Sequence, residues 1–215
     1  MSRAPRLVGF VFAVAAAMII ALAGPLLLFN PWFVSFEQRR NDVAPALAVD
    51  QAAVDHVTGA ILLDLVTHGD FDVSLDGRQP LLDAMERSHM RDVSGLVRLL
   101  VAILGAAVVL FAMSRAWLRE GRRRGRLLVL AGAAIGAVAV VLAIIFAVAF
   151  EPAFLAFHRL FFAQGTYLFG PDSKLIKLFP EGFWFESSLV AGATIVMAAL
   201  LAGLLGWRLM RERDP

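Results

Sequence analysis

The stretch Arg87-Ser88-His89-Met90-Arg91-Asp92-Val93 stands directly before a long apolar segment that begins at Leu96. It places a histidine between two arginines and an aspartate at the point where the chain enters a membrane. Charged and titratable groups at such a position cost free energy unless they are paired, so they usually serve a function. A second histidine, His158, follows another apolar segment. We expect the two histidines to meet at the outer membrane face.

The composition is that of an integral membrane protein. Of the 215 residues, 60% are hydrophobic, which is far more than a soluble domain of this size carries. The chain has no cysteine, which excludes disulfides, thiolate catalysis and cysteine-ligated metals. No sequence motif points to another metal or to a cofactor, so we expect neither. Nucleic-acid binding is disfavoured because the basic residues flank apolar segments.

Four apolar segments each have about the 20 residues that a helix needs to cross the hydrocarbon core. The first also resembles a signal peptide, but its apolar run is longer than such a peptide needs, which favours an uncleaved helix. The predicted fold class is an all-α membrane protein, with four transmembrane helices and a small, mainly helical extracytoplasmic cap. The expected boundaries are transmembrane helices at 1–30, 96–114, 127–150 and 188–210, a cap at 31–95, an Arg-rich loop at 115–126, an aromatic-rich extracytoplasmic segment at 151–187 and a tail at 211–215.

Charge segregation predicts the orientation of these segments. The two ends of the chain and the 115–126 loop together carry eleven basic and three acidic residues, whereas the other two connections are rich in acidic residues. The positive-inside rule therefore places both termini and the Arg-rich loop in the cytoplasm. We expect a multi-pass protein of the cytoplasmic membrane, with its histidines at the outer face.

Local patterns predict the elements of the cap. Asp50 can cap a helix that runs to His68, with four apolar side chains on one face, which are Val54, Val57, Ile61 and Leu65. Alternating apolar residues at 71–75 predict a short strand or hairpin. Pro80 can open a further helix, which we expect to run from Leu81 into the second span and to carry His89.

Aromatic residues are concentrated around the second histidine. Residues 146–185 hold twelve of the chain's twenty-two aromatic side chains. An aromatic belt at the membrane interface accounts for some of them. A pocket for acyl chains or for a lipid headgroup is the alternative, and composition alone leaves both interpretations open.

His89 and His158 are the groups best placed to act as acid and base near neutral pH. In a helix, Asp92 lies one turn from His89 and could fix its tautomer through a hydrogen bond. The alternative is that both rings simply lie in the headgroup region, where amphipathic side chains are stable. No hydrolase or metalloprotease motif is present to decide between these interpretations.

Three runs of residues resemble the signature runs of the lipoprotein intramolecular transacylase family, whose members are bacterial integral membrane proteins. They are His89–Val93, Phe157–Phe162 and Asp172–Trp184, and they occur in the family's order on one expected membrane face. The resemblance implies four transmembrane helices with an extracytoplasmic cap, and two catalytic histidines in an aromatic-rich pocket at the junction of cap and membrane. These histidines correspond to His89 and His158.

The resemblance also implies an activity. The sn-2 acyl chain of a diacylglyceryl lipoprotein would move to the α-amine of its N-terminal cysteine, giving a lyso-form lipoprotein without nucleotide or metal. The expected partners are that lipoprotein and membrane lipid. The residues expected to orient the histidines or to bind substrate are Arg91, Asp92, Phe157, Arg159, Phe161, Tyr167 and Trp184. A non-catalytic lipid-binding or assembly partner remains the alternative function.

Overall fold

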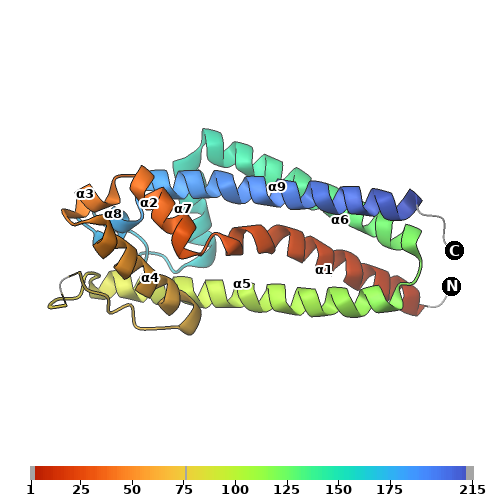
Figure 1. The fold of residues 1–215 in the computed structure, drawn as a ribbon, viewed down its shortest axis with the longest axis horizontal. Helices are drawn as coiled ribbons and strands as arrows, with labels where there is room; N and C mark the ends of the chain where they lie inside the picture. Colours follow the sequence, from red (N-terminus) through yellow and green to blue (C-terminus); the bar gives the residue numbers. More distant parts are fainter. Residues whose placement is uncertain (1–2, 76, 212–215) are drawn as a thin grey trace. The chain divides into compact units, whose positions relative to one another are not determined.

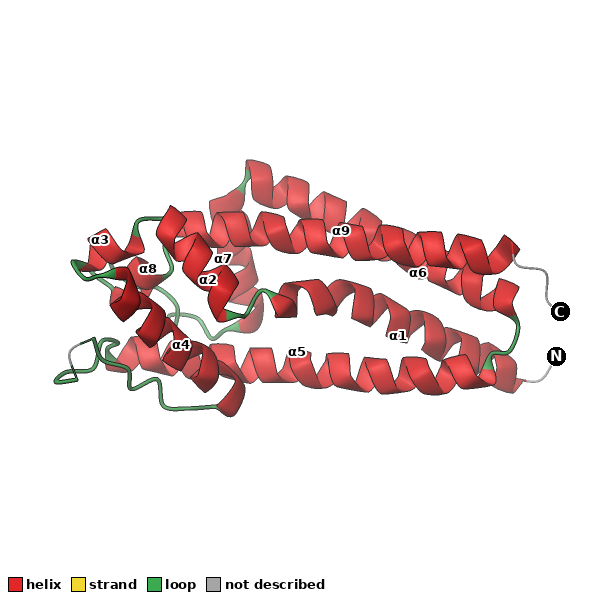
Figure 2. Ribbon diagram, viewed as in Figure 1, coloured by secondary structure: helices red, strands yellow, loops and turns green. Residues whose placement is uncertain are grey.

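The computed structural model describes residues 3–75 and 77–211, and in these residues it has helices and loops but no strand (Figure 2). This is the predicted all-helical class. The helices are α1 (Arg3–Leu27), α2 (Pro31–Arg40), α3 (Val43–Leu47), α4 (Gln51–Thr67), α5 (Ala84–Trp117), α6 (Gly121–Val148), α7 (Phe150–Phe161), α8 (Lys174–Leu178) and α9 (Glu181–Arg211) (Figure 1).

The helices divide between two compact units. Residues 3–27, 100–144 and 190–211 belong to one, which we call the bundle unit. Residues 28–99 and 145–189 make up the other, which we call the histidine unit because it contains His89 and His158. The long helices α5, α6 and α9 each contribute to both units.

Four helices are long and apolar enough to cross a membrane, as the sequence predicts. They are α1, α5, α6 and α9. In the bundle unit, Phe12 and Ile20 of α1 pack in one buried cluster with Leu128 of α6 and Ala199 of α9. Many of the remaining apolar side chains of these helices are exposed, for example Leu99 and Val141, as expected for faces that contact lipid.

Glycines let α6 and α9 approach to backbone contact within the bundle unit. A Cβ placed on Gly125 would lie 2.4 Å from the carbonyl oxygen of Gly206, and one placed on Gly206 would lie 2.5 Å from that of Gly125. Further along, a Cβ on Gly132 would lie 2.7 Å from the Ala199 carbonyl oxygen. Small residues at a helix–helix contact let membrane helices approach closely, which explains Gly132 in the third span.

The core of the histidine unit is built on α4. Its N-cap is Asp50, whose carboxylate accepts a hydrogen bond from the Ala53 amide at 2.7 Å. The predicted apolar face is buried, and Phe71, Leu82 and Leu178 pack against it. The helix ends where His68 adopts a left-handed conformation, with φ 60°.

α5 begins three residues later than the sequence analysis expected, at Ala84 instead of Leu81. Asp83 and Glu86 form a capping box: Asp83 accepts from the Glu86 amide at 2.8 Å, and Glu86 accepts from the Asp83 amide at 2.8 Å. The helix then runs without interruption to Trp117, so a single element carries His89 and the second span. That continuity was predicted.

The strand predicted at 71–75 is wrong, because these residues form a loop. Phe71 is fully buried and has a positive φ of 57°, which no regular strand allows. Its amide donates to the Asp64 carboxylate at 2.8 Å, so a side chain of α4 takes the place of a strand partner.

Candidate active site

The two histidines lie beside each other in the histidine unit. His89 comes from α5 and His158 from α7, and their ring centroids are 5.9 Å apart with an interplanar angle of 26°. His89 is buried, and His158 is partly exposed. At this separation, the reacting atoms of one small group can contact both rings.

The hydrogen bonding of His158 defines its tautomer. Its Nδ1 lies 2.8 Å from the backbone oxygen of Phe154, one turn earlier on α7. A carbonyl oxygen only accepts, so Nδ1 must carry the proton and donate it. The other ring nitrogen, Nε2, then has a free lone pair in the neutral ring.

The environment of His158 favours this neutral form. Burial lowers the pKa of His158, and the hydrogen bond to Phe154 only partly offsets that effect. His158 therefore remains uncharged at neutral pH. A neutral imidazole with a free lone pair can act as a base.

His89 has a different polar environment. Its Nδ1 atom is buried and has no hydrogen-bond partner among the described residues. The hydrogen bond that the sequence analysis considered, in which Asp92 would accept from this ring, is therefore not formed at Nδ1, and Asp92 is exposed. A buried nitrogen without a partner costs free energy, and at a functional site a bound group can supply the partner.

Aromatic rings surround the histidine pair on several sides. Phe162 contacts both rings, with centroid distances of 4.9 Å to His89 and 5.5 Å to His158. Phe169 lies 5.6 Å from His89, and Tyr167 lies 5.2 Å from His158. Phe154 and Phe157 complete the ring contacts of His158. Rings from α7 and the following loop therefore converge on the pair, which an interfacial belt alone does not explain.

The other expected site residues lie at different distances from the pair. Trp184 contacts Phe154 at 6.0 Å, so it is one ring removed from His158. Phe161 contacts Phe157 with ring centroids 4.9 Å apart and an interplanar angle of 48°, and Phe161 is itself exposed. Arg159 is exposed on α7. Arg91 is exposed on α5, where it lines a pocket with Asp70, Asp72 and Arg87.

Sequence reasoning did not single out Glu86, Phe162 or Phe169. Glu86 is buried one turn before His89 on α5. Its carboxylate accepts hydrogen bonds from the Ser173 hydroxyl and, at 3.0 Å, from the Leu175 amide at the start of α8. Glu86 thereby fixes the segment that follows Phe169 to the helix that carries His89. The sequence signal was available, since Glu86 stands three residues after the capping Asp83.

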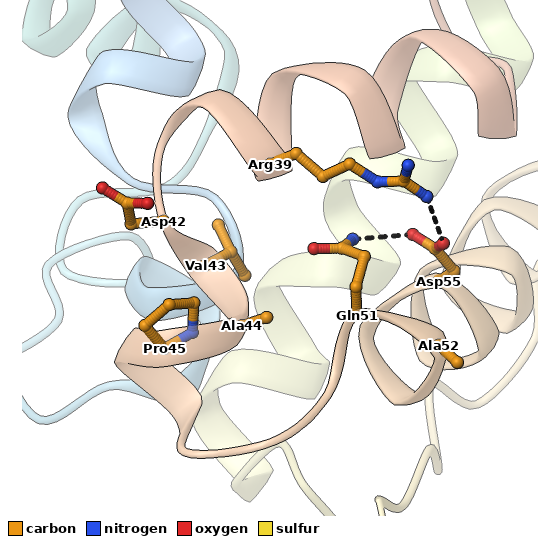
Figure 3. A pocket seen from close by; sticks show the side chains of 8 residues that line it. All are labelled: Arg39, Asp42, Val43, Ala44, Pro45, Gln51, Ala52 and Asp55. Atoms are coloured by element: carbon orange, nitrogen blue, oxygen red, sulfur yellow. Dashed lines mark hydrogen bonds and ion pairs between the residues drawn. The ribbon is translucent and has the colours of Figure 1, made fainter.

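The described residues also form a pocket away from the histidines. A pocket of about 380 Å³ lies between α2, α3 and α4, and Figure 3 shows Arg39 and Gln51 both directed at Asp55 there. Asp55 accepts from Arg39 at 2.9 Å, from Gln51 at 2.8 Å and from Ser35 at 2.6 Å. Burial by itself raises the pKa of Asp55, but these three hydrogen bonds, together with the charge of Arg39, outweigh it and lower that pKa. The same hydrogen bonds occupy the Asp55 carboxylate with partners from the protein, so the polar residues of this pocket have a structural role.

No group of three or more histidine and acidic side chains that could hold a metal ion is found in residues 3–75 and 77–211. The two histidines offer imidazole acid–base chemistry inside a shell of aromatic rings. Fold and site together define a helical integral membrane protein with a histidine-pair centre.

Comparison with known proteins then identifies the family. The family model described as lipoprotein intramolecular transacylase Lit matches residues 9–184. The chain belongs to this family, and it is thus a membrane enzyme that moves an acyl group within a lipoprotein. No curated protein matches the chain.

Solved structures support the fold. The membrane-integral lipoprotein intramolecular transacylase Lit from Bacillus cereus superposes with a TM-score of 0.86 at 19% identity, covering 98% of each chain. Two structures of that protein with one histidine replaced, by arginine or by alanine, give TM-scores of 0.77 at 19% identity. They cover 96% of this chain and 92% and 94% of theirs.

Proposed function

We propose that His89 and His158 transfer the sn-2 acyl chain of a diacylglyceryl lipoprotein to the α-amine of its N-terminal cysteine. The product is a lyso-form lipoprotein that carries an N-acyl chain. The observation that carries this proposal is the pairing of two histidines from α5 and α7, 5.9 Å apart, inside an aromatic shell. The family assignment supplies the substrate class.

His158 is the base in this scheme. The α-amine has a pKa of about 7.7–8.0, so a part of it is uncharged near neutral pH, and a neutral imidazole can take the one proton that this uncharged amine gives up on acylation. Nε2 of His158 has the free lone pair for that step, because Nδ1 donates to Phe154. The amine nitrogen then attacks the sn-2 carbonyl carbon, which forms the new carbon–nitrogen bond.

His89 assists the two oxygen atoms of the ester in this scheme. The bond between the carbonyl carbon and the sn-2 glyceryl oxygen breaks, and that oxygen takes up the proton that left the amine. An N–H group of the His89 ring donates a hydrogen bond to the developing oxyanion and then assists the departure of the glyceryl oxygen. The two rings are adjacent, so charging both together is unfavourable, and one proton passes through the pair.

The aromatic shell holds the reacting ends together. Amine and ester belong to one molecule, and well-oriented intramolecular reactions reach effective molarities of about 10⁵–10⁸ M. Phe162 and Phe169 cover His89 and limit its access to water. Exclusion of water favours attack by the amine over hydrolysis of the ester.

The same proposal places the site at the outer face of the bacterial cytoplasmic membrane. Residues 31–95 and 151–187 lie outside and both termini lie inside, because the arginine-rich 115–126 loop and chain ends favour the cytoplasm. The histidine unit spans both of these segments, which supports placing His89 and His158 on the same side of the membrane.

The test is tandem mass spectrometry of a reporter lipopeptide after incubation with the purified protein. A substrate with a free amine should give an N-acylated product of unchanged mass. His89→Ala and His158→Ala should each lower the rate by about 10²–10⁴-fold, and the double variant should lose little more. The matched control is His56→Ala, which changes an exposed histidine of α4 and should leave the rate unchanged.

A substrate already acylated at its amine supplies the second control. An amide nitrogen is too weak a nucleophile, so the sn-2 chain of this substrate should stay in place. Loss of a free fatty acid from the substrate with the free amine would instead indicate hydrolysis of the ester. Binding without any change of either substrate would favour a non-catalytic lipid-binding protein.

A further inference from the structure

A second pocket in the histidine unit has the chemistry of a ligand site. It has a volume of about 300 Å³ and is lined by Asp70, Asp72, Ala84, Arg87 and Arg91. Arg87 and Arg91 lie one turn apart on α5, so their side chains share one face of that helix. His89 lies two residues from each arginine, about 200° around the helix, so this pocket is separate from the histidine pair.

The arginines of this pocket have unused hydrogen-bonding capacity. Arg87 contacts Asp72 at 3.4 Å, but its Nε atom is buried without a partner. Arg91 is exposed and forms no ion pair within the described ranges. Asp55 in the larger pocket, by contrast, has three partners. An arginine fork with free donors matches the oxygens of a phosphate group.

The charged side chains that line the pocket indicate which class of ligand fits it. Two arginines face two aspartates, so the lining has no net charge. A free phosphate dianion would meet repulsion from both carboxylates. A zwitterion that carries a phosphate and an amine would pair with both kinds of side chain.

The position on α5 indicates where such a ligand comes from. Arg91 lies five residues before Leu96, where the apolar segment begins. At about 1.5 Å per residue this is about 7.5 Å along the helix, which is the thickness of a headgroup layer. A phospholipid in the surrounding membrane therefore presents its headgroup at the height of Arg91.

We propose that this pocket binds the headgroup of a zwitterionic aminophospholipid, with the phosphate on Arg87 and Arg91 and the amine on Asp70 and Asp72. The site lies outside the reaction centre and is independent of the proposed acyl transfer. Its role is to hold one lipid against the first turns of α5.

The experiment measures binding to the purified full-length protein in detergent, through the shift of its unfolding temperature. The ligands are dihexanoyl phosphatidylethanolamine, dihexanoyl phosphatidylglycerol, free phosphoethanolamine and inorganic phosphate. We expect phosphatidylethanolamine to bind most tightly. Arg91→Gln should weaken that binding by about tenfold or more, because charge-assisted hydrogen bonds are lost. The control, Lys174→Gln, removes an exposed positive charge elsewhere in the unit and should leave the affinity unchanged.

Three outcomes would overturn the proposal. Phosphatidylglycerol binding as tightly as phosphatidylethanolamine would show that the amine is not recognised. Phosphoethanolamine or inorganic phosphate binding as tightly as the lipid would show that a soluble phosphate compound, and not a membrane lipid, is the ligand of the site. Equal lipid affinity in Arg91→Gln and in the unaltered protein would place the bound lipid elsewhere. Arg91 is exposed, so its variant should fold, which the unfolding temperature without ligand checks directly.

Discussion

Glu37 of α2 is a carboxyl group that must hold a proton to be stable in its environment. It is 2% exposed, and its partner is another carboxyl group, that of Glu186. Glu186 also accepts from Arg40 at 2.9 Å and from Asn41 at 3.4 Å. Two acids can share a hydrogen bond only when one is protonated. Burial, followed by the hydrogen bond and the charge of Glu186, raises the pKa of Glu37 to about 7.

This proton makes folding stability depend on pH. Glu37 has a pKa of about 7 in the folded chain against an ordinary value of 4.5. The folded state therefore binds the extra proton between these values. Its contribution is complete below pH 4.5 and is lost as the pH rises through about 7. Thermal unfolding in detergent from pH 5 to pH 8.5 should show this decline, and Glu37→Gln, which keeps a donor without titrating, should flatten it. Parallel curves for the two proteins would assign the pH dependence to other groups.

The sequence predicted which residue types form the candidate site, but not which of their side chains point inward. The sequence indicated His89, His158 and the aromatic cluster, because histidines and rings are conspicuous near apolar segments. It could not say which face of α5 packs inward. His89 is buried, whereas Arg91 and Asp92, two and three residues later, are exposed. Glu86 was missed because an acidic residue near a helix start is usually only a cap.

At the scale of elements, the contact between α5 and α8 through Glu86 should decide how well the aromatic shell is held. Glu86→Ala would leave the buried Leu175 amide without an acceptor, which costs about 1–3 kcal/mol. Phe169 precedes this contact and would lose its fixed position over His89. We expect a lower free energy of unfolding in urea, together with a lower rate of acyl transfer.

Two variants separate the role of this contact from the charge itself. Glu86→Gln keeps an acceptor for the Leu175 amide and should be the milder change. Asp92→Ala removes an exposed carboxylate from the same helix and should leave the unfolding free energy within about 0.5 kcal/mol. An unfolding free energy of Glu86→Ala equal to that of Asp92→Ala would contradict the structural role of Glu86.

A helix was predictable from the sequence where its cap and its apolar spacing both lie within the helix itself. α4 follows from its capping Asp50 and its apolar spacing, and the structure has both. The loop at 71–75 was not predictable in this way, because Phe71 is held by the distant Asp64 carboxylate. Alternation of apolar residues favours a strand only when a neighbouring strand is available to pair.

At the scale of the whole molecule, the orientation in the membrane is open to a direct test. The chain has no cysteine, so single introduced cysteines report without background. Ala46 on α3 and Arg122 in the first turn of α6 are both exposed residues, which makes Ala46→Cys and Arg122→Cys suitable reporters. An impermeant maleimide added to intact cells should label Ala46→Cys only, and both should be labelled after lysis. Labelling of Arg122→Cys in intact cells would invert the proposed topology.

The four spans could be predicted from length and apolarity, because the thickness of the bilayer fixes both. How α6 and α9 meet could not, since a glycine pair indicates a close approach without naming the partner. In the bundle unit, the approach is at Gly125 and Gly206, and each glycine faces the other's carbonyl oxygen.

That reciprocal contact determines how this position can change in evolution. In an ordinary core, a side chain that becomes too large can be accommodated when a neighbour becomes smaller. Here a methyl group at Gly125 would meet the backbone of Gly206, and no substitution shortens a backbone. A second-site suppressor acting by reduced size is therefore impossible at the facing position. A genetic screen starting from Gly125→Ala should recover true revertants or changes that move α9 as a whole.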